Sequence, residues 1–231
     1  MKIAFVIVAT NRYMQFVPPL LDSIHQHFLT KTDKDYFVFT NVMDYQLPHD
    51  AKKIEILSKG WPGDSYYRYH YFLSIREQLE KYDYIYYLDA DMRVVGEVGE
   101  EVLTELLGVQ HPGFITNKQG TPEDRQVDST AYVTRDKILQ YCCGGFQGGS
   151  AKEYLKLCEI ISGNIDEDDR KGILAIYHDE SHVNRYFVDN PPTRILNAGY
   201  CAPESAWKVP FPYKVLALDV SVDTILDKGN R

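Results

Sequence analysis

The chain has 231 residues, of which 44% are hydrophobic and 25% are charged, and its formal net charge is −8. These values are typical of a soluble globular protein and exclude a disordered or fibrous chain. The acidic balance also argues against a nucleic-acid partner, because no surplus of Lys and Arg is present to neutralise phosphates.

Strands and helices alternate in the first part of the chain. An apolar strand over Ile3–Val8 leads through the polar turn Ala9–Tyr13 into a helical pattern over Met14–Phe28. Two short strands are expected at Tyr36–Thr40 and Ile54–Leu57. This order begins a βαβ arrangement and predicts a largely parallel sheet, with a ligand site along its carboxyl edge.

Two carboxylates end the next predicted strand. The segment Gly60–Gly63 interrupts regular structure, a helix is expected from about Ser65 to Tyr82, and the strand that follows ends on Asp89 and Asp91. Side chains at i and i+2 of an extended segment point to the same side, so both carboxylates could bind one cation. Mg²⁺ and Mn²⁺ prefer such oxygen ligands together with phosphate oxygens, which predicts a metal-assisted nucleotide site. Because Asp also caps helices and opens turns, the pair alone does not establish it.

The regular alternation is lost after this strand. Val98–Leu107 has a helical pattern, His111–Phe114 predicts a turn into a strand, and Gly120–Arg125 predicts a polar loop. Four glycines within six residues follow in the segment Cys142–Ser150, which indicates backbone passing close to a ligand or to another segment. A helix is expected over Ala151–Ile161, with the last residue of the glycine-rich segment as its N-cap.

The segment HDESH, residues 178–182, places four ionisable side chains in five positions. His178 and His182 are four residues apart and could share a zinc ion on one helical face, although the zincin pattern places Glu directly after the first His. Alternatively, Glu180 faces a reacting carbon while Asp179 and His178 hold substrate hydroxyls. A third possibility is a first helical turn whose acids complement the helix dipole. The segment alone does not decide among the three.

These segments, in this order and at these separations, resemble glycosyltransferase family 6, which contains the mammalian blood group A and B transferases, the α-1,3-galactosyltransferase, and shorter bacterial and phage homologues. The resemblance is carried by Asp89–Asp91, His111–Phe114, Gly144–Ser150 and His178–Tyr186, and extends over Val8–Tyr200. The D-x-D pair is common to many transferases, but the last two segments together are specific. The membrane anchor and stem of the mammalian members are missing here, which implies a soluble bacterial or phage-type member.

The resemblance implies an α/β protein of GT-A fold. A Rossmann-like, nucleotide-binding half with a mostly parallel sheet is expected over about residues 1–95, fused to an acceptor-binding and catalytic half over about residues 96–231, in a single catalytic domain. The implied reaction moves N-acetylgalactosamine or galactose from its UDP conjugate to the 3-hydroxyl of a galactoside, for which fucosyl-α-1,2-galactose is the family-based expectation, with retention as an α-linkage. A zinc hydrolase on His178 and His182, or a non-catalytic sugar-nucleotide or glycan-binding module, are the alternatives.

The resemblance also assigns residues to roles. Glu180 matches the nucleophile, and Asp89 and Asp91 match the Mn²⁺ (or Mg²⁺) site, so metal dependence is expected. UDP-sugar contacts are expected from Val8, Ala9, Tyr13, Arg68, Asp89, Ala90, Asp91, Gly144, Gly145 and Asp179. Acceptor contacts are expected from His111, Tyr177, His178 and Glu204.

Donor and acceptor preference depend on positions where family members differ. Gly145 matches the glycine of the N-acetylgalactosamine enzyme, where the galactose enzyme has Ala, and this favours UDP-N-acetylgalactosamine. One methyl group discriminates by only about 1–3 kcal/mol. Tyr177 replaces a Trp of the family, and Tyr200–Glu204 lacks the Trp-Asp pair of the acceptor site, with Glu204 as a substitute, so the acceptor stays open.

The remaining features concern the compartment and the chain ends. Four cysteines in a chain of this size do not form a disulfide framework, and the adjacent pair at 142 and 143 lacks zinc-finger spacing, so structural thiols in a reducing cytoplasm are expected. No stretch approaches the roughly 18 apolar residues of a membrane span. Residues 1–8 are too short for a signal peptide, so the protein is expected to begin at its first strand. The tail after Asp219 is expected to be weakly folded.

Overall fold

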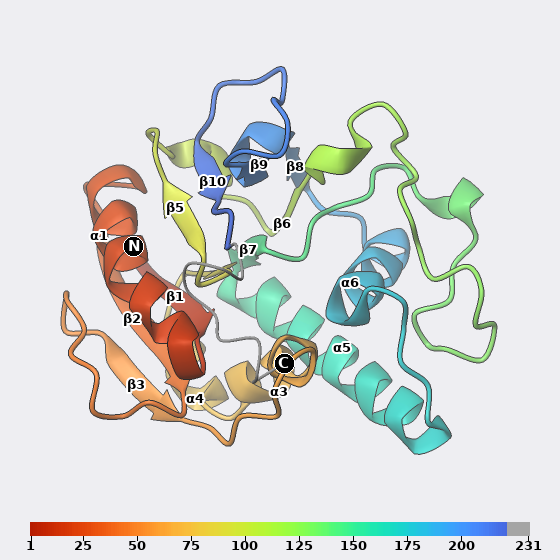
Figure 1. Cartoon of the computed structure of the whole chain (residues 1–231), viewed down its shortest axis with the longest axis horizontal. Helices are drawn as coiled ribbons and strands as arrows, with labels where there is room; N and C mark the ends of the chain where they lie inside the picture. The colour runs from red at the N-terminus through yellow and green to blue at the C-terminus, as the bar shows by residue number, and fades with distance from the viewer. Residues whose placement is uncertain (221–231) are drawn as a thin grey trace.

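The computed structural model describes residues 1–220 and is built around a seven-stranded sheet (Figure 1). Its strands, in spatial order, are β3 (Lys52–Glu55), β2 (Asp33–Thr40), β1 (Lys2–Val8), β4 (Tyr84–Leu88), β7 (Phe146–Ser150), β6 (Leu106–Val109) and β8 (Arg194–Leu196). β7 is antiparallel to both of its neighbours, whereas all other neighbouring strands are parallel. The predicted α/β fold with a mostly parallel sheet is therefore confirmed.

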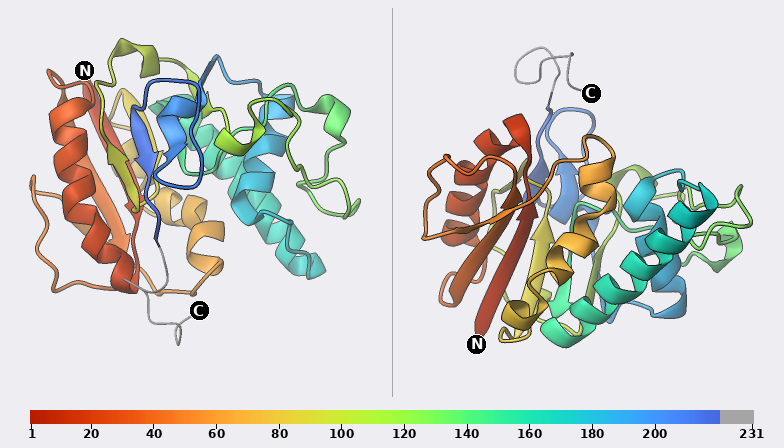
Figure 2. Two further views of the ribbon diagram at one scale, coloured as in Figure 1. Left: turned by 45° about the horizontal axis from the view of Figure 1, so that its top comes forward. Right: turned by 90° about the horizontal axis from the view of Figure 1, so that it is seen from below.

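Helices cover both faces of this sheet (Figure 2). Alternate residues of β1 point to opposite sides: Phe5 belongs to the core that includes α1 (Val17–His27), whereas Val6 belongs to the core that includes α5 (Ala151–Lys171). A continuous apolar run is typical of a parallel strand that is buried on both faces. The sequence KIAFVIV of β1 therefore reflects its place near the middle of the sheet.

Three elements of the first half have other bounds than predicted. Helix α1 begins at Val17 rather than Met14, after a 3₁₀ turn η1 (Asn11–Phe16), because two prolines occupy its first turn, where a missing N–H is tolerated. β2 begins three residues before its predicted start, and β3 lies two residues earlier than predicted. These shifts leave the order of elements unchanged.

The predicted helix from about Ser65 to Tyr82 is divided into three short helices. They are α2 (Gly63–Tyr66), α3 (Arg68–Leu73) and α4 (Arg76–Leu79). The backbone leaves the helical region at Tyr67 and Ile75, where ψ is 11° and 25°. The first break lies directly before Arg68, whose guanidinium is held by Asp89 and Gly144 at the sheet edge and by Asp179, so tertiary contacts override helix propensity here.

The predicted helix over Val98–Leu107 is wrong. Only the 3₁₀ turn η2 (Glu100–Val102) forms, and the chain then enters β6, whose residues Leu106 and Leu107 are buried in the cores on opposite faces of the sheet. A short apolar run does not distinguish a fully buried strand from a buried helix.

The predicted strand after His111 is also wrong. Residues 110–145, all of which the structure describes, contain the 3₁₀ turns η3 (Pro112–Phe114) and η4 (Arg135–Lys137) and no strand beyond one isolated bridge. The polar loop predicted over Gly120–Arg125 is part of this irregular region, as expected.

The glycine-rich segment enters the middle of the sheet as β7. A Cβ on Gly149 would lie 2.2 Å from the carbonyl oxygen of Glu105, so another segment passes close to this part of the backbone. Ser150 caps α5 as predicted, since its side chain accepts a hydrogen bond from the N–H of Glu153. The helix continues ten residues beyond its predicted end and stops at Gly172, whose φ of 68° is left-handed.

The remaining elements are α6 (His178–Asp189), the 3₁₀ turn η5 (Ala198–Cys201) and a small second sheet of β5 (Met92–Val94), β10 (Val215–Ala217) and β9 (Ala202–Pro203).

Across residues 1–220, no helix has the length and apolar character needed to cross a membrane. The four cysteines are buried as free thiols. Most of the tail predicted to be weakly folded, residues 221–231, lies outside the described part of the chain.

Candidate active site

A cavity of about 380 Å³ opens where β4 ends, β7 approaches and α6 begins. Its walls are formed by Trp61, Ser65, Arg68, Asp89, His111, Phe114, Thr121, Gly144, Gly145, Tyr177, His178, Asp179 and Glu180. The volume lies in the range of small-molecule sites, and the lining combines aromatic rings with a few charged groups, as such sites usually do. Residues from five separate parts of the sequence therefore converge at the predicted edge of the sheet.

Asp89 and Asp91 lie in a turn rather than in the extended strand assumed from the sequence. β4 ends at Leu88, and the N–H of Met92 donates to the carbonyl of Asp89 at 3.1 Å. Asp89 nevertheless remains close enough to influence its neighbour: burial and the charge of Asp89 raise the pKa of Asp91 to about 7. Two carboxylates in this relation favour a bound cation, which would relieve their repulsion.

The carboxylates of Asp89 and Asp91 suit a hard divalent ion whose other ligands would be oxygens of a bound phosphate group and water. No cluster of three or more His, Cys, Asp or Glu side chains able to hold a metal occurs within residues 1–220. Mg²⁺ typically uses one or two carboxylates together with phosphate and water oxygens, so Asp89 and Asp91 are the residues that would hold such an ion.

Arg68 is the buried cation of the site. Its guanidinium forms an ion pair with Asp179 at 2.8 Å and lies 3.4 Å from Asp89, and it also donates to the carbonyl of Gly144 at 3.1 Å. The guanidinium also lies 4.3 Å from the centre of the Tyr87 ring. Burial lowers the pKa of Arg68, but the two carboxylates outweigh it, so the group stays charged. It holds a fixed positive charge between the sheet edge and α6.

Glu180 faces the glycine-rich segment. Its Oε2 accepts a hydrogen bond from the N–H of Gly144 at 2.7 Å. Burial raises the pKa of Glu180 to about 7, although this hydrogen bond partly opposes the shift. Burial likewise raises the pKa of Asp179 to about 6, against the opposing charge of Arg68. The site therefore contains two carboxylates whose proton affinity is tuned upward by desolvation, which is typical of functional groups.

Two buried amide side chains fix this geometry and were not identified from the sequence. Asn184 donates to the carbonyls of Cys142 and Glu180 at 2.9 Å each, and accepts from the N–H of Cys142 at 2.8 Å. Gln147 donates to the carbonyl of Gly144 at 2.8 Å. α6 is thereby tied to the segment that enters β7. The contacts of Asn184 with Cys142 join residues 42 positions apart, which no local pattern reveals.

Gly145 lies against the acidic pair. A Cβ at this position would be 2.6 Å from Oδ2 of Asp89 and 2.6 Å from Cε of Met92, so the absent methyl makes room for the Asp89 carboxylate. At Gly144 a Cβ would instead lie 3.2 Å from Cβ of Glu180. Gly145 thus lets the backbone approach Asp89, and Gly144 lets it approach Glu180.

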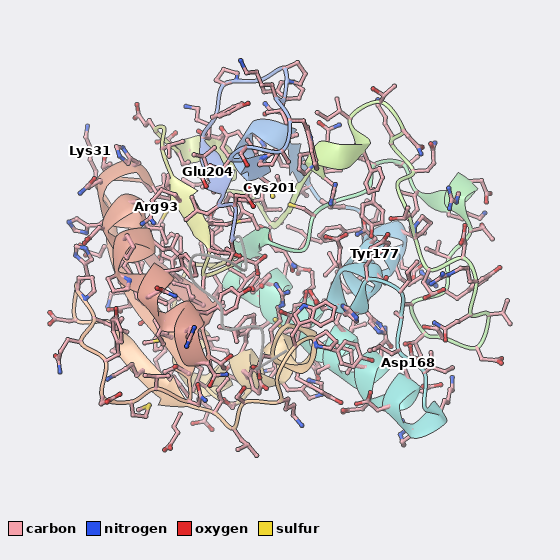
Figure 3. The ribbon with its side chains drawn as sticks, in the orientation of Figure 1. Lys31, Arg93, Asp168, Tyr177, Cys201 and Glu204 are labelled. Carbon is pink, nitrogen blue, oxygen red and sulfur yellow. The ribbon has the colours of Figure 1, made fainter. Side chains whose placement is uncertain are left out.

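The predicted acceptor residues are only partly brought together. His111, Tyr177 and His178 line the cavity, whereas Glu204 does not and instead accepts a hydrogen bond from the N–H of Asp219 near β9 and β10. Figure 3 labels Glu204 in that region and Tyr177 beside α6. The aromatic wall also contains Trp61, which was not predicted and whose ring meets His178 edge-on at 5.4 Å.

His111 presents one defined nitrogen. Its Nδ1 accepts from the N–H of Gly113 at 3.0 Å, and burial lowers its pKa to about 4. A neutral ring whose Nδ1 accepts must carry its proton on Nε2, so His111 offers an N–H donor there.

The predicted nucleotide contacts before β2 lie apart from these groups. Val8 and Ala9 are at the end of β1 and Tyr13 is in η1, and none of the three lines the cavity. The cavity lining likewise does not include Ala90 or Asp91. Val8 and Ala9 lie at the carboxyl end of β1, and Ala90 and Asp91 lie just after the carboxyl end of β4. A ligand that extends along this sheet edge would pass these residues.

The two histidines of the alternative zinc site lie in different surroundings. The ring of His178 contacts Trp61 in the cavity, whereas His182 is fully buried with its Nε2 at 3.7 Å from Asp168. Since they share no third ligand in the described part of the chain, this arrangement does not favour the zinc-hydrolase alternative.

Comparison with known proteins gives a consistent result. The sequence profile of glycosyltransferase family 6 matches residues 1–222. Histo-blood group ABO system transferase 1 of Rattus norvegicus is 33% identical over 215 residues, which are 89% of this chain and 60% of that protein. O-antigen biosynthesis glycosyltransferase WbnI of Escherichia coli is 28% identical over 203 residues, which are 85% of this chain and 86% of that protein.

A further similarity is to Globoside alpha-1,3-N-acetylgalactosaminyltransferase 1 of Gallus gallus, 28% identical over 203 residues. The match covers 83% of this chain and 59% of that protein. This chain therefore spans about 60% of the length of the rat and chicken relatives.

Proposed function

Because this chain belongs to glycosyltransferase family 6, we propose that it is a retaining α-1,3-glycosyltransferase. It moves N-acetylgalactosamine or galactose from a UDP-sugar to the 3-hydroxyl of a galactoside. The observation that carries the proposal is the placement of Glu180 in one cavity with Asp89 and Arg68. A carboxylate that faces a sugar carbon and a cationic region that receives a diphosphate are the two requirements of this chemistry.

The leaving diphosphate is assigned to the side of the cavity formed by Asp89 and Arg68. Mn²⁺ or Mg²⁺, held by Asp89 and Asp91, would act there as a Lewis acid that neutralises charge on the departing oxygen. Arg68 adds a positive charge that is already oriented, since its guanidinium is fixed by Asp179 and by the carbonyl of Gly144. Such preorganised charge needs no rearrangement during the reaction.

Glu180 acts on the sugar carbon. Its carboxylate either attacks this carbon, forming a covalent intermediate, or stabilises the positive charge while the acceptor enters on the face of the leaving group. In both cases the N–H of Gly144 fixes the carboxylate, and the side chain must be ionised. We assign the donor hydroxyls to Asp179, which is adjacent in sequence and paired with Arg68.

For the donor we favour UDP-N-acetylgalactosamine, with UDP-galactose as the second candidate. Gly145 matches the glycine of the N-acetylgalactosamine enzyme, and the name of the chicken relative specifies N-acetylgalactosamine transfer. For the acceptor, the aromatic wall of Trp61, Tyr177 and His178 suits the apolar face of a sugar ring. His111 adds its Nε2 donor, and a fucosyl-galactoside is the proposed substrate.

The proposal predicts UDP release that depends on a divalent ion. Purified protein with Mn²⁺, a fucosyl-galactoside and either donor should release UDP, and excess chelator should abolish this release because Asp89 and Asp91 would be left without their cation. Re-addition of Mn²⁺ should restore it. Undiminished release in chelator would contradict the assignment of Asp89 and Asp91, whereas no release from any donor over a broad acceptor panel would favour a glycan-binding module.

A further inference from the structure

The entry into α6 is strained at the residue that precedes the two functional carboxylates. His178, the first residue of α6, has a φ of 49°, which is left-handed and unfavourable for a side chain with a Cβ. Such a conformation persists only where the surrounding structure holds it. Because Asp179 and Glu180 follow directly, the direction of their side chains depends on whatever holds this segment.

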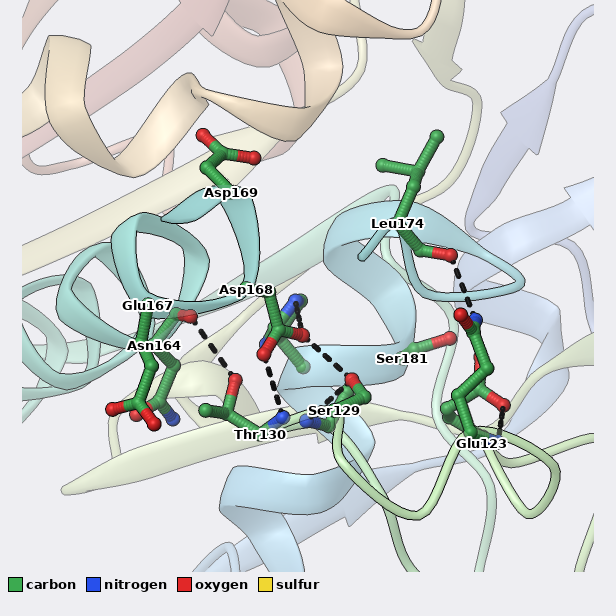
Figure 4. Close-up of polar contacts among 12 residues, drawn as sticks. Glu123, Ser129, Thr130, Asn164, Glu167, Asp168, Asp169, Leu174 and Ser181 are labelled. Carbon is green, nitrogen blue, oxygen red and sulfur yellow. Dashed lines mark hydrogen bonds and ion pairs between the residues drawn. The ribbon is translucent and has the colours of Figure 1, made fainter. Parts of the chain in front are cut away.

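Glu123 holds the chain immediately before His178. It is fully buried, and its Oε2 accepts a hydrogen bond from the N–H of Ile176 at 2.7 Å. Gln126 donates from Nε2 both to Oε2 of Glu123 at 3.1 Å and to the carbonyl of Leu174 at 2.9 Å. Figure 4 labels Glu123 and Leu174, and a dashed line marks the hydrogen bond that the carbonyl of Leu174 accepts. The connection between α5 and α6 is therefore held at two backbone positions.

The loop that carries Glu123 is itself anchored to α5. Asp168, also fully buried, accepts from Oγ of Ser129 at 2.6 Å and from the N–H of Thr130 at 2.7 Å (Figure 4). Thr130 then donates to the carbonyl of Asn164 at 3.1 Å. Residues 129–130 of the loop are thus bonded to α5, and Glu123 and Gln126 are bonded to residues 174–176. The loop therefore fixes the connection between α5 and α6 to α5 itself.

The carboxylate form of Glu123 is the one that these contacts require. Its other oxygen, Oε1, accepts from the N–H groups of Arg125 and Gln126 at 3.1 Å each. Burial alone would raise the pKa of Glu123, but the N–H donors, with that of Ile176 foremost, outweigh it and keep the pKa below its usual value. Four donors on two oxygens leave no position for an N–H on this side chain.

We propose that Glu123 is a positioning residue for Glu180. By holding the connection between α5 and α6, it maintains the left-handed conformation of His178 and thereby directs the Asp179 and Glu180 side chains into the cavity. This inference rests on the proposed function in that it gives Glu180 the catalytic part. It assigns a role to a side chain that does not itself line the cavity.

The substitution Glu123→Gln tests the proposal. Its amide must lose at least two of the four hydrogen bonds, so we expect kcat to fall by about 10²-fold, the effect of a displacement near 1 Å. The Kd for UDP should stay unchanged, because Asp89 and Asp91 do not belong to α6 and Arg68 keeps its contact with the carbonyl of Gly144, whereas the KM for the donor should rise as Asp179 is displaced with Glu180. Asp124→Asn is the matched control: it removes the exposed ion pair with Arg135 from the same loop and should leave kcat unchanged.

A fluorescence measurement tests the same inference without activity. In a Trp207→Phe background, Trp61 is the remaining tryptophan, and its ring contacts His178. Because Trp61 is exposed and its contact with His178 is the feature that would change, Glu123→Gln should alter its emission intensity, and Asp124→Asn should not. If Glu123→Gln folds poorly, Gln126→Ala, which removes only the bonds to Glu123 and Leu174, should give the same changes in reduced form.

The outcomes separate this inference from the proposed function. Wild-type kcat and wild-type Trp61 emission in Glu123→Gln, with or without a lower Tm, would overturn the positioning role. If the wild-type protein releases no UDP from any donor, the proposed function fails, and the Trp61 measurement alone then decides whether Glu123 holds the entry of α6.

Discussion

Glu180→Gln is expected to lose most sugar transfer, by about 10²- to 10³-fold in kcat or more, while UDP binding is retained. The amide oxygen of Gln can still accept from the N–H of Gly144, so the fold of the site should be preserved. What is lost is the negative charge that faces the sugar carbon. Steady-state kinetics with UDP titration measures both effects, and turnover like that of the wild type would exclude Glu180 from its proposed role.

The same prediction has a pH component and a control. Since burial raises the pKa of Glu180 to about 7 and only the ionised form acts, kcat/KM of the wild type should rise with pH through about 7. The matched change Glu159→Gln, at a carboxylate whose side chain is 62% exposed, should leave kcat and this profile unchanged.

Arg68→Met is expected to cause the largest loss of stability in the site, about 3–5 kcal/mol in the free energy of unfolding. The Arg68 side chain is only 5% exposed, and its removal leaves Asp179 as a buried carboxylate without its partner. Urea denaturation measures the loss. The double variant with Asp179→Asn should recover part of it, because no uncompensated charge then remains.

A matched comparison sharpens this second prediction. Arg76→Met removes an exposed arginine from the neighbouring α4, where it pairs with Glu80 and Glu159, and such surface pairs contribute about 0–1 kcal/mol. If Arg68→Met cost no more than Arg76→Met, the buried ion pair with Asp179 would not have the structural importance assigned to it.

The sequence predicted best where periodicity was long and consistent. β1, α1 and β4 follow from continuous apolar runs and turn signals. The convergence of the site residues at the carboxyl edge follows from the parallel order of the strands. β6 was mistaken for a helix because two adjacent leucines face different cores, a distinction that only the sheet makes. Asp89 lies in a turn and not in the predicted extended strand, yet its charge still raises the pKa of Asp91.

For the site, motif segments identified the groups that face the cavity but not those that hold them. Glu180 and Asp89 are found on the motif segments, and they line one cavity with Arg68, which lies on none of them. Asn184 and Glu123 act through backbone groups far away in the sequence, so their importance appears only when the hydrogen-bond partners of each buried polar atom are known. Glu204 was predicted for the acceptor only as a substitute for the Trp-Asp pair of the family, and the fold places it outside the cavity.

The central claim is transfer of a sugar to the 3-hydroxyl of a galactoside with retention, and the structure of the product tests it most directly. The protein should be incubated with Mn²⁺, UDP-N-acetylgalactosamine or UDP-galactose, and a fucosyl-galactoside, and the purified product examined by NMR. The account predicts a new α-anomeric signal and a linkage to carbon 3 of galactose. A β-linked product, or donor hydrolysis without any transfer product, would contradict it.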